Sequence, residues 1–198
     1  MNRFSNRLLK IFSKIPVLET PRLLLRRLRV SDYLDMYEYS SLDEVTEYLL
    51  WYPHKDEDYT YRYLEHVQSE YRTGDFYDWA VVYKADDKMI GTCGFTSFDL
   101  PNNSAEIGYV INPEYWGIGI AAEAALAVIE YGFTSLKLNR IEARYMCGNN
   151  KSRRVMEKCG MSFEGIIRSA LYNKNEYKDV GVCAILSREY FNNLQKRI

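Results

Sequence analysis

The stretch from residue 105 to residue 133 constrains the fold most, because its apolar residues change their spacing part-way along. Residues 105–111 show the alternation that is typical of a β-strand with two different faces. From residue 119 onwards the apolar residues recur at helical spacing and form one stripe: Ala122, Ala125, Leu126, Ile129 and Phe133. The pattern predicts a strand, a short turn and then a helix.

The end of this turn carries little side-chain bulk. Gly117 and Gly119 are followed by Ala121 and Ala122. The first N–H groups of a helix have no partner within the helix and carry a partial positive charge, so phosphate oxygens bind there when no side chain blocks them. The segment lacks the Gly-Lys-Ser/Thr of a nucleotide P-loop and the third glycine of a dinucleotide-binding turn. A pyrophosphate is the expected ligand; the alternative is that the glycines only turn the chain.

Similar patterns place further elements on both sides of this segment. We expect strands at residues 18–28, 79–83, 89–98, 105–111, 141–147, 162–168 and 178–186. We expect helices at residues 31–39 with Ser31-Asp32 as the N-cap, and at 43–52, 56–72, 119–133, 150–159 and 189–196. The three strands from 79 to 111 are spaced like an antiparallel meander. Together these elements predict an α/β fold with one mixed sheet.

Composition limits the classes of partner. A net charge of −1 over 198 residues argues against a field that draws the chain to nucleic acid or to a membrane surface. Four widely spaced cysteines and two histidines in non-ligand spacing predict neither a metal site nor a disulfide framework. No apolar run approaches the roughly 20 residues of a membrane helix, so stable membrane insertion is not expected.

The length suits one domain, which we place at residues 16–198. Residues 1–15 form a basic, amphipathic arm that precedes it. We expect this arm to pack on its own domain or on a second copy of the chain; the alternative is a membrane-surface anchor.

Four segments in the same order resemble the GCN5-related N-acetyltransferase (GNAT) family, particularly the branch that acetylates ribosomal-protein N-termini. They are Glu19-Thr-Pro-Arg-Leu-Leu-Leu-Arg26, Ala105-Glu-Ile-Gly-Tyr109, Glu114-Tyr-Trp-Gly-Ile-Gly-Ile-Ala-Ala-Glu-Ala125 and Asn149-Asn-Lys-Ser-Arg-Arg-Val-Met-Glu-Lys-Cys-Gly-Met161. The resemblance covers residues 18 to 190. It implies a central, mostly antiparallel sheet of about seven strands flanked by helices and splayed at an acetyl-CoA site. It also implies a cytoplasmic monomer or homodimer.

The resemblance identifies residues 114–125 as the acyl-CoA pyrophosphate loop. It implies acetyl-CoA as cosubstrate, no metal, and a set of CoA-binding residues: Val110, Ile111, Gly117, Ile118, Gly119, Ile120, Ala121, Ala122, Asn149 and Ser152. The family often begins this loop with Arg or Gln, whereas Glu114 stands here. Binding is therefore expected to depend on backbone N–H groups.

Two residues are candidates for the chemistry. Glu106 shares a strand face with Gly108, and family members are similarly thought to use an acid on this strand to deprotonate the amine, directly or through water. The alternative for Glu106 is a carboxylate that faces solvent or pairs with Arg144. Asn149 and Ser152 match the family's Asn-x-x-Ser, which implies contact with the pantetheine arm and a Ser152 proton for the leaving thiolate. The alternative is that Asn149 and Ser152 only cap the helix, because Asn and Ser are common at helix starts; the two roles are compatible.

The expected acceptor wall comprises Trp51, Tyr52 and His54, with Tyr172 reaching from the closing hairpin. The predicted activity is acetyl transfer from acetyl-CoA to a primary amine by direct attack in a ternary complex. The expected acceptor is a protein N-terminal α-amine. The alternatives are a small amine, such as a polyamine, antibiotic or amino-acid derivative, and a non-catalytic acyl-CoA-binding module.

Overall fold

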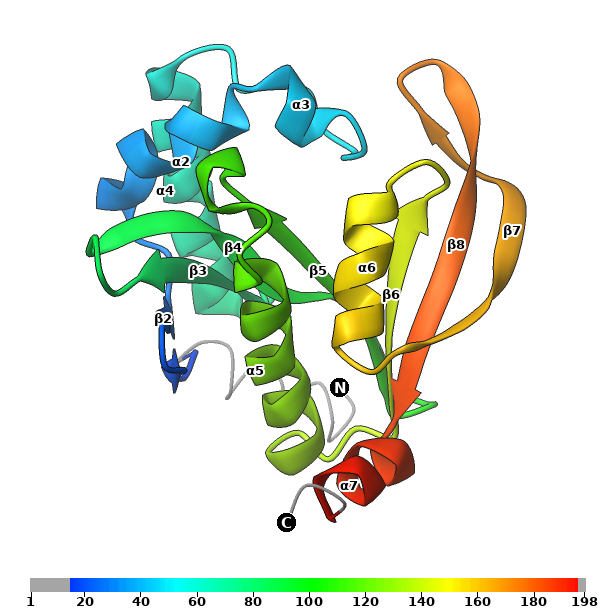
Figure 1. Ribbon diagram of the computed structural model, residues 1–198. Helices are drawn as coiled ribbons and strands as arrows, with labels where there is room; N and C mark the ends of the chain where they lie inside the picture. Colours follow the sequence, from blue (N-terminus) through cyan, green and yellow to red (C-terminus); the bar gives the residue numbers. More distant parts are fainter. Residues whose placement is uncertain (1–14, 196–198) are drawn as a thin grey trace. The chain divides into compact units, whose positions relative to one another are not determined.

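The computed structural model describes residues 15–195 (Figure 1). The predicted arm over residues 1–15 therefore lies outside the described residues except for Ile15. The strands are β1 Leu18–Glu19, β2 Leu23–Arg26, β3 Asp78–Tyr83, β4 Lys88–Asp99, β5 Ser104–Ile111, β6 Arg140–Met146, β7 Ser162–Asn173 and β8 Glu176–Leu186. The α-helices are α2 Tyr33–Ser40, α3 Asp43–Thr46, α4 Glu57–Thr73, α5 Ile120–Thr134, α6 Asn150–Lys158 and α7 Ser187–Gln195. Two 3₁₀ turns, η1 Val30–Asp32 and η2 Pro113–Tyr115, precede α2 and α5.

The strands form one sheet in the order β1-β2-β3-β4-β5-β6-β8-β7. Antiparallel pairs join β1 to β2, β2 to β3, β3 to β4, β6 to β8 and β7 to β8. The pair of β5 with β6 is parallel, with Glu106 opposite Glu142. The predicted α/β class with a mixed, mostly antiparallel sheet is confirmed.

The described chain divides into two compact units, one with residues 15–94 and 109–124 and the other with residues 95–108 and 125–195. Each unit buries its own apolar side chains. The largest in the first unit are Trp79, Tyr71, Leu23, Leu25, Leu28, Leu64, Met89, Ile90 and Ile120. Those in the second unit include Phe133, Ile129, Val128, Ile141, Tyr145, Met146 and Ile185.

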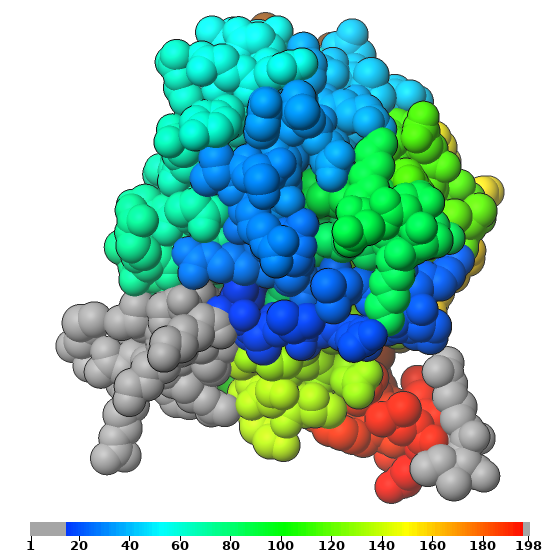
Figure 2. Space-filling view, turned by 90° about the vertical axis from the view of Figure 1, so that its left-hand side faces the viewer, coloured from blue at the N-terminus to red at the C-terminus, as the bar shows by residue number. Residues whose placement is uncertain are grey.

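In the first unit, α4 packs beside α2 (Figures 1 and 2). Helix α4 begins where the Asp56 carboxylate accepts the N–H of Tyr59, at 2.7 Å. It ends at Gly74, whose φ of 75° is the left-handed conformation that glycine adopts most easily. The predicted helix at 56–72 is confirmed, and both of its ends follow from local chemistry.

Hydrogen bonds that turn the chain change two predicted elements. The single strand expected at 18–28 is two strands, because the Leu23 N–H donates to the Thr20 hydroxyl and closes a turn at Pro21. The sheet therefore has eight strands rather than seven. The helix expected at 43–52 covers only Asp43–Thr46, since the His54 N–H donates to the carbonyl of Ser40 and the chain must turn back to reach it.

Two smaller predictions hold only in part. Asp32 stands at the N-cap of α2, but its side chain makes no cap hydrogen bond there. Its carboxylate instead pairs with the Arg26 guanidinium at 2.8 Å and accepts the Arg29 N–H at 2.7 Å. Leu126 is 38% exposed and lies outside the buried stripe of α5. The stripe includes Val128 instead.

The Asp78 carboxyl is a titratable group of the first unit whose pKa is strongly raised. Among residues 15–195, its Oδ1 is buried without a hydrogen-bond partner. Burial raises the pKa of Asp78 to about 7, against the lowering effect of hydrogen bonds from Thr92 and from the Trp79 N–H. A carboxyl whose pKa is raised on folding is protonated in both states at low pH. It lowers stability as pH rises above the unfolded pKa, and the loss is complete above the folded pKa.

We predict that Asp78→Asn stabilises the protein more at pH 8 than at pH 5, because the penalty of the buried carboxylate is only partly present at pH 5. Between the ordinary pKa near 4 and the folded pKa near 7, the unfolded state loses its proton first, so the parent's stability falls as pH rises. We expect a gain of about 2 kcal/mol at pH 8, because the asparagine amide must also be buried. Denaturant unfolding at both pH values measures it. The exposed Asp75→Asn is the control, and an equal effect of Asp78→Asn at both pH values would contradict the assignment.

Candidate active site

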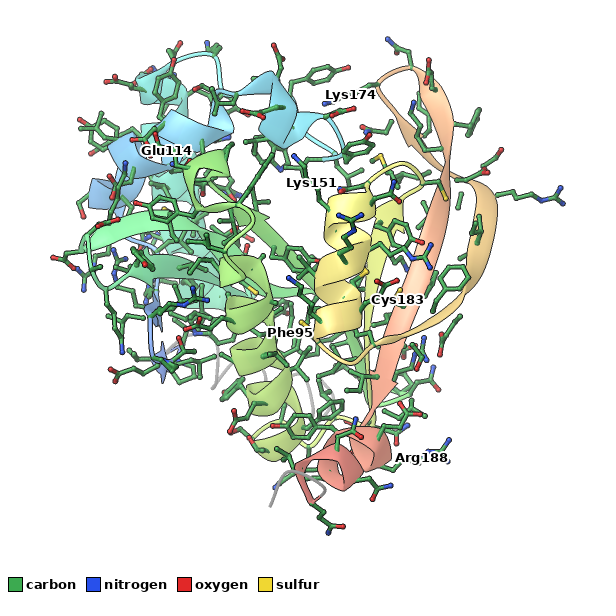
Figure 3. All side chains as sticks on the ribbon, viewed as in Figure 1. Phe95, Glu114, Lys151, Lys174, Cys183 and Arg188 are labelled. Atoms are coloured by element: carbon green, nitrogen blue, oxygen red, sulfur yellow. The ribbon has the colours of Figure 1, made fainter. Side chains whose placement is uncertain are left out.

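The turn that leads from β5 to α5 is fixed by Asn112. Its amide Nδ2 donates to the Glu38 carboxylate at 2.8 Å, and its Oδ1 accepts the N–H of Glu114 at 3.0 Å. The Trp116 indole N–H then donates to the Ile111 carbonyl at 2.6 Å. Glu114 lies on this turn, immediately before α5 (Figure 3). The side chains hold the backbone of the turn in one path, and the sequence had not singled out Asn112.

The two loop glycines have the conformation that glycine alone adopts readily. Gly117 has a φ of 81° and Gly119 a φ of 86°. A Cβ on Gly117 would meet nothing within 4 Å, so the backbone there is open. Helix α5 begins directly afterwards at Ile120, whose side chain is buried. The open backbone at a helix N-terminus fits an anionic ligand such as the predicted pyrophosphate.

The loop is tied to the start of the chain by three residues that the sequence did not identify as functional. In the first turn of α5, the Glu123 carboxylate accepts hydrogen bonds from the Thr20 hydroxyl at 2.6 Å, the Arg22 N–H at 3.0 Å and the Arg22 Nε at 2.6 Å. The Nη1 of Arg22 donates to the carbonyl of Ile118 at 3.0 Å. The sequence signal for Thr20 and Arg22 was the segment Glu19-Thr-Pro-Arg, which contributed to the family resemblance but had no predicted role in the site.

The other predicted CoA residues in this unit continue from the loop. Val110 is half-buried and Ile111 buried at the end of β5, while Ile118 is exposed. Ala121 is half-buried and Ala122 buried in the first turn of α5. Their contact with CoA stays a prediction.

Glu106 is the end of a chain of ion pairs in the second unit. Its Oε2 lies 3.5 Å from Nε of Arg144, which also binds Glu142 at 2.9 Å. Glu142 pairs with Arg140 at 2.9 Å, and Arg140 pairs with Glu164 at 2.6 Å. The predicted alternative pairing of Glu106 with Arg144 is therefore present.

Burial raises the pKa of Glu106 above its ordinary value, in spite of the opposing charge of Arg144, and the neighbouring Glu142 raises it further. A carboxyl with a raised pKa holds a proton more strongly and is a better base once ionised. The electrostatics of Glu106 therefore suit the role of general base that the sequence predicted.

We predict that Glu106→Gln lowers kcat by about 10²-fold or more at neutral pH, because the amide cannot take a proton. In the parent, kcat/KM should fall as pH drops through a pKa above the ordinary glutamate value, and the variant should lack this limb. A pH–rate profile of both proteins measures the effect. Glu142→Gln, which also removes a charge beside Arg144, is the control for the ion-pair network. An unchanged profile would assign the proton to another group or to water.

Helix α6 has Asn149 at its N-cap. The side chain of Asn149 accepts the Ser152 N–H at 3.0 Å, so Asn149 is the N-cap and Ser152 lies within the first turn. The prediction that Asn149 is a cap is confirmed, and the cap role of the Ser152 hydroxyl stays a prediction. The contact of either residue with pantetheine is untested and stays a prediction.

Asn149→Ala should destabilise the protein by about 1 kcal/mol, because it leaves the Ser152 N–H without its partner. Denaturant unfolding measures the loss. Asn150→Ala removes an exposed asparagine one residue further along, and we expect it to change stability by less than about 0.5 kcal/mol. Equal effects of the two substitutions would show that the cap contributes nothing measurable.

The four predicted acceptor residues differ in exposure. His54 is buried: its Nδ1 lies 2.8 Å from the Thr60 hydroxyl, its ring packs against Trp51 and Tyr59, and burial lowers its pKa. Tyr52 is 64% exposed. Tyr172 is 61% exposed and packs on Tyr177 across the β7–β8 hairpin, whose tip carries Lys174 (Figure 3). The structure thus brings Trp51 and His54 together and leaves the two tyrosines open to solvent.

Three further observations concern residues 15–195. They contain no group of three or more His, Cys, Asp or Glu able to hold a metal ion. Cys93, Cys159 and Cys183 are buried and Cys147 is exposed, and none of the four forms a disulfide with another cysteine of this range. None of the helices in this range has the length and apolar character needed to cross a membrane.

A family model described as an acetyltransferase (GNAT) domain matches residues 22–162, which is more than half of the chain. The chain belongs to the GNAT family. A Bacillus licheniformis protein named "Uncharacterized N-acetyltransferase p20" is 36% identical over 173 residues, covering 87% of this chain and 97% of that protein. A GNAT-family acetyltransferase from Bacillus anthracis has a crystal structure with a TM-score of 0.79 and 32% identity, covering 88% of this chain and all of that one. These matches show that the protein is an acetyltransferase enzyme of the GNAT family.

Two other similar proteins carry names that mention acceptors. The Bacillus subtilis protein named "Putative ribosomal N-acetyltransferase YdaF" is 37% identical over 105 residues, covering 53% of this chain and 57% of that protein. The spermidine N-acetyltransferase of Vibrio cholerae, solved with CoA and spermine, has a TM-score of 0.73 and 25% identity, covering 87% of this chain and all of that one. The GNAT family is thus shown, and the acceptor of this member is a separate question.

Proposed function

We propose that this GNAT enzyme transfers the acetyl group of acetyl-CoA to the α-amine at the N-terminus of a protein or peptide. The observation that supports acetyl-CoA most directly is the loop at residues 117–122, where two glycines with positive φ lead into α5 and leave the backbone open. In this proposal the loop N–H groups bind the pyrophosphate, Val110 and Ile111 contact CoA, and Asn149 and Ser152 contact the pantetheine arm.

The residues of the chain divide the chemistry as follows. The acceptor nitrogen forms a bond to the acetyl carbonyl carbon as the bond from that carbon to sulfur breaks. Glu106 takes the amine proton, directly or through water, and Ser152 gives a proton to the departing sulfur. An α-amine has a pKa of about 8 and is partly neutral at cell pH, so it needs only modest help from a base.

The exposure of the candidate acceptor residues supports a polypeptide substrate. Tyr52 and Tyr172 are largely open to solvent, as expected for residues that contact a chain extending away from its own N-terminus. Small ligands are usually bound in concave pockets that cover most of their surface. The similarity to YdaF, and the resemblance of residues 18–190 to the ribosomal-protein branch, support the same acceptor.

A small cationic amine is the second candidate, because the spermidine N-acetyltransferase of Vibrio cholerae is similar over its whole length. A primary amine of lysine type has a pKa of about 10.4 and is almost fully protonated at neutral pH. Such an acceptor would depend more strongly on Glu106 than an α-amine does.

We predict that the purified protein consumes acetyl-CoA with peptides that have a free N-terminus and not with the same peptides after N-terminal formylation. The blocked N-terminus has no nucleophilic amine, so the two peptides differ only at the predicted reacting atom. Release of CoA thiol and the mass of the peptide measure the reaction. Turnover of spermine or spermidine in place of the peptides would favour the second candidate.

The same assay tests the loop through Gly119→Val, which should weaken acetyl-CoA binding by tenfold or more, because valine is strained at a φ of 86° and the loop N–H groups should shift from the proposed pyrophosphate site. Gly160→Val is the matched control: Gly160 also has a positive φ, of 79°, and its added Cβ would likewise have 3.7 Å to its nearest neighbour. The control should lose stability without losing acetyl-CoA affinity. Unchanged affinity in Gly119→Val would remove the loop from the proposal.

A further inference from the structure

The carbonyl of Ile118 has a fixed direction in the loop. It accepts the hydrogen bond from Nη1 of Arg22 at 3.0 Å. The peptide bonds of the described chain are trans, and in a planar trans peptide the C=O and the following N–H point in opposite directions. The N–H of Gly119 therefore points away from the Arg22 guanidinium. Arg22 determines the side of the loop on which this donor is presented.

Arg22 is itself held by the helix that the loop begins. Its Nε lies 2.6 Å from Oε2 of Glu123, and its backbone N–H donates to Oε1 of the same carboxylate at 3.0 Å. The Glu123 N–H in turn donates to the Gly119 carbonyl at 3.1 Å. The guanidinium, the carboxylate and the loop thus form one closed set of hydrogen bonds.

The charge of this set is nearly balanced. Burial raises the pKa of Glu123, but bonds from the Thr20 hydroxyl and from the backbone and side chain of Arg22 more than offset this, and the pKa is lowered. The carboxylate is ionised and also lies in the first turn of α5, where the helix dipole favours an anion. Glu114, at the other end of the loop, adds no cation. Backbone donors are consequently the main attraction that the loop offers a phosphate.

We infer that Arg22 is a positioning residue for acetyl-CoA: it turns the Ile118–Gly119 peptide so that the Gly119 N–H faces the pyrophosphate. The inference rests on the proposed role of the loop as the pyrophosphate site. Holding the peptide in advance spares the ligand the cost of ordering it, so the contribution appears in binding and not in the chemical step. Glu123 and Thr20 act through Arg22 by holding its side chain and backbone.

The test compares two acetyl donors with the intact protein. Arg22→Met should raise the Kd and KM for acetyl-CoA roughly tenfold, which is the effect of losing a hydrogen bond from a charged group. With S-acetylpantetheine, which lacks the pyrophosphate, kcat/KM should be unchanged, and kcat with acetyl-CoA should also be unchanged. Calorimetry and steady-state kinetics measure these quantities.

A double variant separates positioning from charge. Arg22→Met leaves the Glu123 carboxylate without its cation, and that negative charge alone would repel a phosphate. Adding Glu123→Gln removes the charge but does not restore the bond to the Ile118 carbonyl. We expect the double variant to bind acetyl-CoA as weakly as Arg22→Met, or nearly so. Full recovery of affinity would overturn the positioning role and leave only electrostatics.

The remaining controls distinguish the possible failures. Lys84→Met removes a cation that binds Glu19 and the Thr20 carbonyl next to this set, and it should leave the acetyl-CoA Kd unchanged. If Arg22→Met does not fold, Glu123→Gln alone should show a smaller loss in the same direction. An unchanged Kd for acetyl-CoA, or an equal loss with S-acetylpantetheine, would overturn the inference while the parent still binds acetyl-CoA. A parent that fails to bind acetyl-CoA would overturn the proposed function itself.

Discussion

The Glu123 carboxylate joins segments of the first unit that lie about one hundred residues apart in the chain. It accepts the Thr20 hydroxyl, the Arg22 N–H and the Arg22 guanidinium, and it belongs to the first turn of α5. The turn between β1 and β2 and the loop before α5 are therefore fixed to each other by one group. Because β2 then pairs with β3, the same carboxylate connects the helix start to the sheet.

In the proposed site, this arrangement would let the loop bind an anion without a positive side chain of its own. Positive φ at Gly117 and Gly119 opens the backbone, and Arg22 withdraws the Ile118 carbonyl, which would otherwise be free to face an anion. What remains is a set of N–H groups at a helix N-terminus, where partial positive charge is available without a cation. Glu114 at the position of the family's Arg or Gln is compatible with this kind of site.

In the second unit, Glu106 belongs to a row of ion pairs along the sheet. Glu106 and Glu142 lie opposite each other on parallel strands, and Arg144 lies between the two carboxylates as their shared partner. Burial and Glu142 raise the pKa of Glu106 while Arg144 lowers it, and the net shift is upwards. The ion pair with Arg144 thus joins neighbouring strands of the sheet, and Glu106 still has the raised pKa that suits a general base.

The sequence by itself determined the elements whose periodicity runs without interruption. The strands from 78 to 111, the helix from 120 to 134 and the open loop before it follow from local spacing, because residues on one face of a strand or helix must be buried together. The alternation also placed Glu106 on one strand face with Gly108, and Gly117 and Gly119 stood out just before the helix, whereas Asn149 was identified through the resemblance to the family's Asn-x-x-Ser. The cap at Asn149 was also predictable, since its partner Ser152 is three residues away.

Only the tertiary structure decided which distant polar groups meet. The strand expected at 18–28 is broken by a turn that a hydrogen bond between Leu23 and Thr20, three residues apart, closes. Thr20 also donates to Glu123, which lies more than one hundred residues later in the chain. The early end of α3 depends on the bond from His54 to Ser40, and the Arg22–Ile118 bond spans 96 residues. Local patterns report burial on a face and contain no record of such partners, because a hydrogen bond depends on where folding brings two groups together and not on their separation along the chain.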